Sequence, residues 1–393
     1  MSMPTILTWR LGALGDTLLL LPALAALRAA FPSHTLAVAG APPALAPARW
    51  LGLVDVVLDA SAPALAPLWA PTHGGAQRNA PMARALPPNI ETAIVWSANA
   101  DGIARGLARG GVARVLTAPA VPADDTPMAA HYLRTLAPLG VTPVPFALHA
   151  PADAQAATEQ IWQAATRLLA GTAAPVVLLH PGAGSPTKLW PLAHYRALAR
   201  RLRGAGVAVV WTAGEADESI RARLDDSPER RHVLPVLGLA GLTAVIERAA
   251  VVVSGDCGVA HLTALAGVRG ATLFGPTDPR VWGPPSPRTT VVHLGLPCAP
   301  CGALAPTCPS RICLRALSVD VVYTAVRRQI EAWTSEQGQS DATTRADREW
   351  RPSPSLPVDY HPPVPVPGPP GALQPAVWGN PSKWVLRRST EQE

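Results

Sequence analysis

Short apolar runs alternate with longer segments of helical spacing along the first part of this chain. Apolar runs bounded by turn residues predict buried strands, and apolar residues recurring every three or four positions predict helices. The predicted strands lie at residues 5–9, 35–39, 54–58 and 92–96. The predicted helices lie at residues 17–30, 101–108, 128–137 and 152–170. The helix at 17–30 is apolar on nearly all sides, which indicates burial inside a doubly wound α/β domain.

The same alternation returns after residue 175. Strands are predicted at residues 176–179, 207–211, 251–253, 271–274 and 290–294. Helices are predicted at residues 192–203, 216–225, 242–249 and 259–266. We therefore expect two α/β units of similar size, joined near residues 150–175, with a cleft between them. Open parallel sheets bind ligands beyond the carboxyl ends of their strands, so site residues are expected there.

Two segments depart from this pattern. Residues 60–88 are rich in Ala and Pro, which predicts a loop with a broken helix. From residue 335 onward Pro, Ser, Gln and charged residues dominate, so we predict a Pro-rich disordered tail at 335–393. The basic segment at 383–388 is interpreted as part of a solvated tail, with a peripheral membrane contact as the weaker alternative.

Composition narrows the class of protein. The longest apolar stretch, residues 11–27, is interrupted by Asp16 and Pro22 and lacks a preceding basic region, so neither a membrane span nor a signal peptide is expected. We therefore predict a cytoplasmic protein. The net charge of +6 suits an anionic ligand or an anionic membrane face. Aromatic residues are 5% of the chain and are not interleaved with basic ones, so nucleic acid is not an expected partner.

Four of the five cysteines are clustered, at Cys298, Cys301, Cys308 and Cys313. The C-x-x-C start allows a structural zinc site, but the remaining spacing would close over a very short loop. Reduced, packed thiols are the preferred interpretation for a cytosolic protein. We predict no metal and no cofactor.

The strongest chemical motif begins at His180 and reads H-P-G-A-G-S-P-T-K-L-W-P. It lies between a predicted strand and a predicted helix, where backbone N–H groups and a positive helix end can hold an anion. Gly182 and Gly184 allow a sharp turn and close approach of a ligand. Lys188 is one of only two lysines in the chain, and it supplies a charge suited to phosphate. The alternative is an ordinary surface lysine after a loop.

Other polar residues also follow predicted strands. Asp16 stands at the start of a helix, where it could cap the helix or act as a general base. The segment S-G-D-C-G-V-A-H holds Asp256, Cys257, Gly258 and His261 and could cradle a phosphate or a sugar. A structural role for His261 and an unreactive Cys257 are the simpler interpretations.

Two further groups complete the candidates. Thr277, in L-F-G-P-T-D-P, could donate a hydrogen bond to phosphate or belong to a plain turn. Glu215, Asp217 and Glu218 follow the strand at 207–211, where an acid commonly binds ribose hydroxyls, although acids also favour helix starts. The chain has no D-x-D pair in a suitable loop and no Walker P-loop, so ATP hydrolysis is not expected.

Taken together, these motifs resemble glycosyltransferase family 9, the ADP-heptose:lipopolysaccharide heptosyltransferases. The resemblance is carried by R-L-G-A-L-G-D-T-L-L-L-L-P, the motif with Lys188, the segment with Asp256, and L-F-G-P-T-D-P, and it covers about residues 5–330. The cluster C-x-x-C-x6-C-x4-C also resembles a stretch found in many members. The resemblance implies the α/β GT-B fold, with two facing Rossmann-like domains. We place an acceptor domain at residues 1–165 and a nucleotide-sugar domain at residues 166–334.

The resemblance also implies roles for individual residues. Asp16 would be the catalytic base of an inverting, metal-independent transfer, and Lys188 would neutralise the diphosphate leaving group. Glu215 and Glu218 are our candidates for the nucleotide ribose. The donor and its phosphates would be bound by Lys188, Gly184, Ser185, Asp256, Cys257, Gly258, His261 and Thr277.

The expected function is therefore transfer of a heptose or similar sugar from an ADP-sugar donor to a saccharide or lipid-linked acceptor such as the lipopolysaccharide core. Two alternatives remain open on the sequence. One is a GT-B enzyme that uses another nucleotide sugar. The other is a non-catalytic sugar-nucleotide-binding protein whose tail recruits partners.

Overall fold

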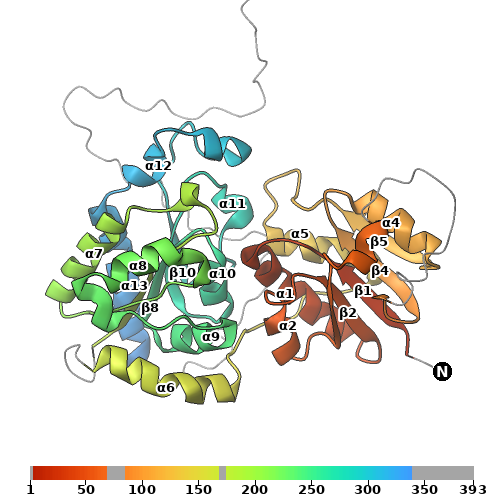
Figure 1. Ribbon diagram of the computed structural model, residues 1–393, viewed down its shortest axis with the longest axis horizontal. Helices are drawn as coiled ribbons and strands as arrows, with labels where there is room; N and C mark the ends of the chain where they lie inside the picture. Colours follow the sequence, from red (N-terminus) through yellow and green to blue (C-terminus); the bar gives the residue numbers. More distant parts are fainter. Residues whose placement is uncertain (1–2, 69–84, 168–173, 339–393) are drawn as a thin grey trace, which may run out of the picture. The chain divides into compact units, whose positions relative to one another are not determined.

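The computed structural model describes residues 3–68, 85–167 and 174–338. Two parallel sheets form its framework, each with five strands among the described residues (Figure 1). This confirms the α/β fold class expected from the alternating pattern. The domain boundary near residue 165 stays a prediction.

The first sheet has the strand order β3-β2-β1-β4-β5. Its strands are β1 (Thr5–Trp9), β2 (Thr35–Gly40), β3 (Val56–Asp59), β4 (Ile90–Trp96) and β5 (Arg114–Ala118). Both faces are covered, because Ile6 joins one hydrophobic cluster while Leu7 and Trp9 join another. Its helices are α1 (Leu14–Ala30), α2 (Ala46–Trp50), α4 (Ala100–Arg109) and α5 (Met128–Thr135).

The second sheet has the order β10-β9-β8-β6-β7. Its strands are β6 (Val176–His180), β7 (Ala208–Trp211), β8 (Val251–Gly255), β9 (Arg269–Leu273) and β10 (Thr289–Val292). The strand order reverses between β6 and β8, and in the first sheet between β1 and β4. Loops after these strands lie at the switch points, where doubly wound sheets bind ligands. The motifs with Asp16, Lys188 and Asp256 follow β1, β6 and β8 respectively.

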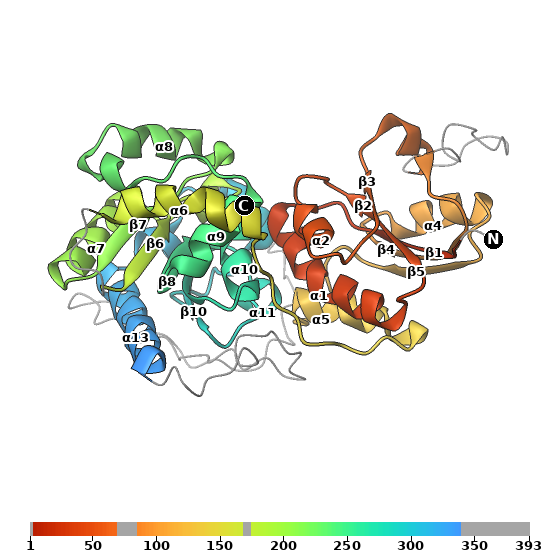
Figure 2. The ribbon, with the colours of Figure 1, turned by 90° about the horizontal axis from the view of Figure 1, so that it is seen from below.

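Helices also surround the second sheet, and Figure 2 shows most of them with labels, seen from below. They are α6 (Ala152–Thr166), α7 (Leu192–Gly204), α8 (Glu218–Asp225), α9 (Leu239–Arg248), α10 (Gly258–Leu265), α11 (Pro279–Trp282), α12 (Ile312–Arg315) and α13 (Val319–Gly338). The strand β5 and the helix α13 were not predicted. Helix α13 includes the first four residues of the predicted tail, and residues 339–393 lie outside the described part of the chain.

The loop predicted at 60–88 contains a 3-10 helix at Pro63–Leu68, and residues 69–84 lie outside the described residues. No helix among the described residues is long and apolar enough to cross a membrane.

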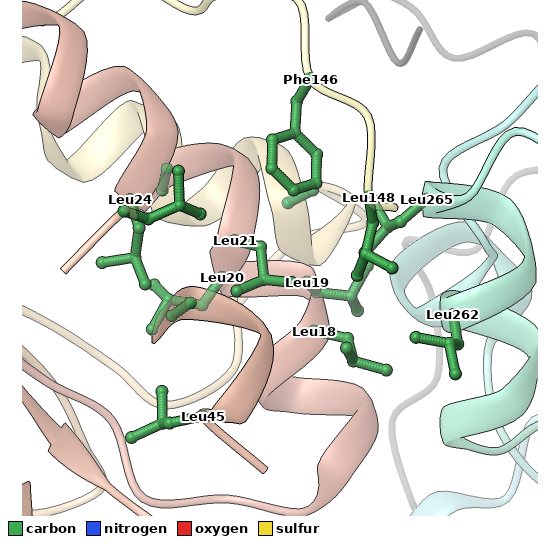
Figure 3. Close-up of a cluster of buried hydrophobic side chains, with 14 of the residues drawn as sticks. Leu18, Leu19, Leu20, Leu21, Leu24, Leu45, Phe146, Leu148, Leu262 and Leu265 are labelled. Atoms are coloured by element: carbon green, nitrogen blue, oxygen red, sulfur yellow. The ribbon is translucent and has the colours of Figure 1, made fainter. Parts of the chain in front are cut away.

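The elements packed around helix α1 explain why its sequence is apolar on nearly all sides. One side packs on the first sheet and α5, while another packs against α10 of the second unit. Figure 3 shows Leu18 and Leu19 of α1 on the side of Leu262 and Leu265 of α10, while Leu20 and Leu21 belong to the same buried cluster. The backbone N–H of Leu148 also donates to the carbonyl of Leu265, 2.8 Å away. One continuous core therefore joins the two sheets through α1 and α10.

We predict that Leu262→Ala lowers the free energy of unfolding by about 2–5 kcal/mol, because Leu262 is fully buried at this junction. Urea denaturation followed by tryptophan fluorescence measures the change. The control is Leu304→Ala at a leucine that is 70% exposed, where a change within about 0.5 kcal/mol is expected. Equal effects at the two positions would contradict a shared core at the α1–α10 contact.

Candidate active site

Lys188, Asp256 and Thr277 meet at the carboxyl end of the second sheet. The Lys188 Nζ and the Thr277 hydroxyl both contact Oδ2 of Asp256, at 2.7 Å and 2.5 Å. Asp256 is 6% exposed whereas Lys188 is 29% exposed. The buried carboxylate therefore holds an ammonium and a hydroxyl side by side, with the ammonium at the surface of the cluster. The Thr277 hydroxyl gives its one proton to Asp256, whereas the ammonium has further N–H groups that suit an anionic ligand.

Helix α10 starts directly beside this cluster. Cys257 is its N-cap and Gly258 its first residue, so the positive end of the helix dipole lies next to Asp256. Burial raises the pKa of Cys257 to about 12, so the side chain remains a thiol at neutral pH. The structure therefore gives Cys257 no nucleophilic character, as the sequence interpretation expected.

Asp16 lies in the first turn of α1 and uses both carboxylate oxygens. Its Oδ2 accepts the backbone N–H of Ala13 at 2.8 Å, and its Oδ1 accepts from Nη2 of Arg10 at 2.7 Å. The first bond is the helix-capping role that the sequence left open. The carboxylate nevertheless remains 16% exposed. Capping and an accessible carboxylate therefore coexist at Asp16.

Two glycines bring the starts of α1 and α10 together. A Cβ on Gly15 would lie 2.9 Å from Cδ2 of His261, and a Cβ on Gly258 would lie 2.5 Å from Cδ2 of Leu14. A side chain at either glycine would require His261, Leu14 or one of the helices to shift. Asp16 and the Lys188–Asp256 pair are therefore placed on either side of the same helix-to-helix contact.

His261 occupies the middle of this contact and is 2% exposed. Burial lowers the pKa of His261, Lys188 lowers it further, and Asp256 and Asp16 oppose the shift. The imidazole is therefore neutral at pH 7. Its Nδ1 has no hydrogen-bond partner within the described residues.

Asp217 packs against the glycine-rich turn after β6. Its Oδ2 accepts the N–H of Gly214 at 2.9 Å within its own segment, and a Cβ on Gly182 would overlap the Asp217 carboxylate. A Cβ on Gly184 would meet nothing, so the turn is open on its outer side. The Ser185 Oγ accepts the N–H of Thr187 at 3.3 Å and fixes the short helix that ends at Lys188.

The three acids after β7 point in different directions. Asp217 is buried against the turn, while Glu215 and Glu218 are exposed. The assignment of ribose to Glu215 and Glu218 stays a prediction. Asp217 instead packs against Gly182, a role that sequence reasoning did not assign.

Sequence reasoning also missed Arg10 and Tyr132, which contact Asp16. The only signal for Arg10 was its position directly after a buried strand, and Tyr132 had none.

The cysteine-rich loop bridges two parts of the site. The N–H groups of Cys301 and Gly302 both donate to the carbonyl of Pro276 at 3.0 Å, next to Thr277. Arg311 donates to the carbonyl of Pro186 at 3.0 Å, next to Lys188. All five cysteines are free thiols, and in the described ranges no three His, Cys, Asp or Glu side chains are grouped to hold a metal. The loop thus connects the turns that carry Thr277 and Lys188.

This arrangement agrees with a comparison against known families. Residues 88–307, more than half of the chain, match the model of glycosyltransferase family 9 (heptosyltransferase). The chain belongs to glycosyltransferase family 9. The membership of this family that four short motifs predicted is therefore confirmed.

Similar family 9 proteins include lipopolysaccharide heptosyltransferase 1 of Pseudomonas aeruginosa, which is 42% identical over 140 residues. The matched segment spans 34% of this chain and 38% of the length of that curated relative. A family 9 glycosyltransferase from Veillonella parvula superposes with a TM-score of 0.66 at 16% identity, covering 84% of this chain and 99% of that one. Escherichia coli heptosyltransferase WaaC with ADP gives a TM-score of 0.56 at 20% identity, covering 83% and 99%. At these identities the structures establish the GT-B fold.

The environments of the cysteines in this family 9 chain predict an order of alkylation by iodoacetamide at pH 7. Hydrogen bonding from the N–H of Arg311 lowers the pKa of Cys308, whereas burial and neighbouring thiols raise the pKa of Cys301. A lower pKa gives more thiolate at pH 7, so Cys308 should react before Cys301, and Cys257 should react last.

Mass spectrometry of time points measures this order. The control is the chain unfolded in guanidinium chloride, in which all five thiols should react at similar rates. Rapid labelling of Cys257 in the folded protein would contradict the raised pKa of its thiol.

Proposed function

We propose that this protein transfers a heptose from ADP-heptose to a saccharide of the lipopolysaccharide core, with inversion at the anomeric carbon and without a metal ion. Membership of family 9 supports heptosyl transfer. The name of the Pseudomonas aeruginosa relative supports the lipopolysaccharide acceptor, and the structure of WaaC with ADP supports the nucleotide. We also place the reaction in the cytoplasm, with peripheral membrane contact through a lipid-linked acceptor.

The observation that carries the proposal is the meeting of α1 and α10 at Gly15 and His261. It sets a carboxylate, Asp16, on one helix start and the Lys188 cation beside the other. A sugar bound between them would have a base on its acceptor side and positive charge on its diphosphate side. An inverting transfer requires these two groups on opposite faces of the reacting carbon.

The proposed step is a single displacement. The acceptor hydroxyl oxygen forms a bond to the anomeric carbon as the bond from that carbon to the diphosphate oxygen breaks. Asp16 takes the hydroxyl proton, and ADP leaves with the bonding electron pair. The accessible edge of the Asp16 carboxylate faces the acceptor in this arrangement.

Lys188 and the first turn of α10 would stabilise the leaving diphosphate. Asp256 holds Lys188 in the structure, so we infer that the ammonium exchanges part of this contact for phosphate oxygens on binding. Gly184, Ser185, Cys257, Gly258 and Thr277 would surround the phosphates, and Glu215 and Glu218 would reach the ribose. Positive charge already supplied by Lys188 and a helix start makes a metal-independent transfer chemically reasonable.

Asp16→Asn should lower kcat by about 10²- to 10⁴-fold, because the amide cannot accept the hydroxyl proton. The affinity for ADP should be unchanged, since Asp16 contacts the acceptor side. Transfer from ADP-heptose to a lipopolysaccharide-core acceptor gives kcat, and calorimetry gives the ADP affinity. The control, Asp101→Asn, removes an exposed acid in the first turn of α4 and should leave both unchanged. A fall of only a few-fold in Asp16→Asn would remove the base assignment.

Lys188→Ala should weaken ADP binding by about tenfold or more, because a charge-assisted hydrogen bond to phosphate contributes about 1.5–3 kcal/mol. Calorimetry with ADP, UDP and GDP in the presence of EDTA measures the affinity. Lys188→Arg keeps the charge and serves as the matched control. Wild-type binding that is lost in EDTA would contradict metal independence of donor binding, and a preference for UDP or GDP would point to another sugar donor.

A further inference from the structure

Arg10 is a buried cation directly behind the proposed base. It directly follows β1, the central strand of the first sheet, and its side chain is 6% exposed. Burial opposes its charge, but Tyr132 and Asp16 outweigh that effect and raise the pKa of Arg10 above its usual value. The guanidinium therefore stays charged. Burying a cation is unfavourable unless its partners are well placed, so the contacts of Arg10 need an explanation.

Each of the three nitrogens of the guanidinium has a different partner. The Nη2 donates to Asp16 Oδ1 at 2.7 Å, and the Nη1 donates to the carbonyl of Leu11 at 2.5 Å. The Nε donates to the hydroxyl of Tyr132 at 2.8 Å. The backbone N–H of Arg10 donates to the carbonyl of Ala39 at 2.9 Å, which anchors the residue to β2. Rotation of the side chain would break all three side-chain bonds.

Tyr132 closes the network from α5. Its hydroxyl accepts from Arg10 and donates to the backbone carbonyl of Asp16 at 3.3 Å. Burial raises the pKa of Tyr132 to about 12, so the hydroxyl keeps the proton that this second bond needs. The ring itself packs edge-on against Trp96, with centroids 5.3 Å apart. Strand β1, helix α1 and helix α5 are thus linked at one point.

We propose that Arg10 and Tyr132 are positioning residues for the reaction, which fix the Asp16 carboxylate at the angle from which it takes the acceptor proton. The inference depends on the proposed transfer. Arg10 holds one carboxylate oxygen and Tyr132 holds the backbone of the same residue, so the two together determine both the place and the rotation of the carboxylate. The remaining edge of the carboxylate is left for the substrate.

This geometry is specific to arginine. A guanidinium donates along several fixed directions, whereas an ammonium on a flexible stem cannot reach Asp16, Leu11 and Tyr132 at once. A residue whose only role was to fill the space behind α1 would have no need of a charge, since apolar replacements of buried ion pairs are often neutral or stabilising. The contact on a carboxylate oxygen therefore indicates control of that carboxylate.

The test combines single and double variants in the ADP-heptose transfer assay. Arg10→Met should lower kcat about 10- to 100-fold, since a misplaced catalytic group can cost about 100-fold in rate. Tyr132→Phe keeps the ring against Trp96 and should lower kcat by a smaller factor. In both variants the affinity for ADP should stay at the wild-type value. Arg10→Lys should recover part of the loss.

The decisive comparison is made in an Asp16→Asn background. If Arg10 acts through the carboxylate, Arg10→Met should cause no further loss once Asp16 is Asn, so the two effects are not additive. If Arg10 had only a structural role, the losses in kcat caused by Arg10→Met and by Asp16→Asn would multiply in the double variant. Thermal unfolding checks that each variant is folded, and Tyr132→Phe decides the case if Arg10→Met does not fold. Arg28→Met is the matched control, because Arg28 pairs with Asp55 at the other end of α1, and its kcat should equal that of the wild type.

Wild-type kcat in both Arg10→Met and Tyr132→Phe, or a fully additive double variant, would overturn the inference while leaving the proposed function intact. A wild-type protein without transfer activity would instead refute the proposed function, and the positioning role with it.

Discussion

The contact between the first turns of α1 and α10 is the constraint on which the rest of the site depends. It is possible only because positions 15 and 258 have no side chain, so that His261 and Leu14 fill the space a Cβ would need. Directly behind the contact, the leucines of α1 and α10 form the core that joins the two sheets. Packing and chemistry are therefore coupled: the apolar junction determines how far the carboxylate of one unit lies from the cation of the other.

Around this contact, the charged groups assigned to catalysis and to the diphosphate already have partners within the chain. Asp16 is matched by Arg10, and Lys188 by Asp256. Pairing reduces the free-energy cost of placing opposite charges in a medium of low polarity. It also holds these side chains in fixed places before a ligand arrives. It also means that substrates must compete with internal partners, which favours ligands carrying strong charge, such as a diphosphate.

The sequence predicted the elements that carry the clearest hydrophobic signal. Nine of the strands were predicted because each contains a run of apolar residues, and the motifs after β1, β6 and β8 were located correctly at sheet ends. Strand β5 was not predicted because Arg114–Ala118 mixes polar and apolar residues and its side chains are exposed or half-buried. Helix α13 was not predicted because its C-terminal end contains Gln and Glu and overlaps the change in composition near residue 335.

The site was predictable only where one segment supplied it. Asp16 and Lys188 stand in local motifs with a clear physical logic. By contrast, Arg10 and Tyr132 are 122 residues apart, and nothing in either segment reveals that they touch. Among the three acids after β7, the turn from Glu215 to Asp217 decides which one faces inward, and that depends on the packing around Gly182 rather than on residue type.

The scarcity of lysine has a practical consequence. The chain contains only Lys188 and Lys383, one at the centre of the candidate site and the other near the C-terminal end of the sequence. The other positive side chains are arginines and histidines, which amine-directed reagents modify poorly. A fluorophore or affinity tag carried by an amine-reactive ester is therefore restricted to two side chains and the N-terminus. Protection of Lys188 from such a reagent would report occupancy of the proposed donor site in real time, without substitution of any residue.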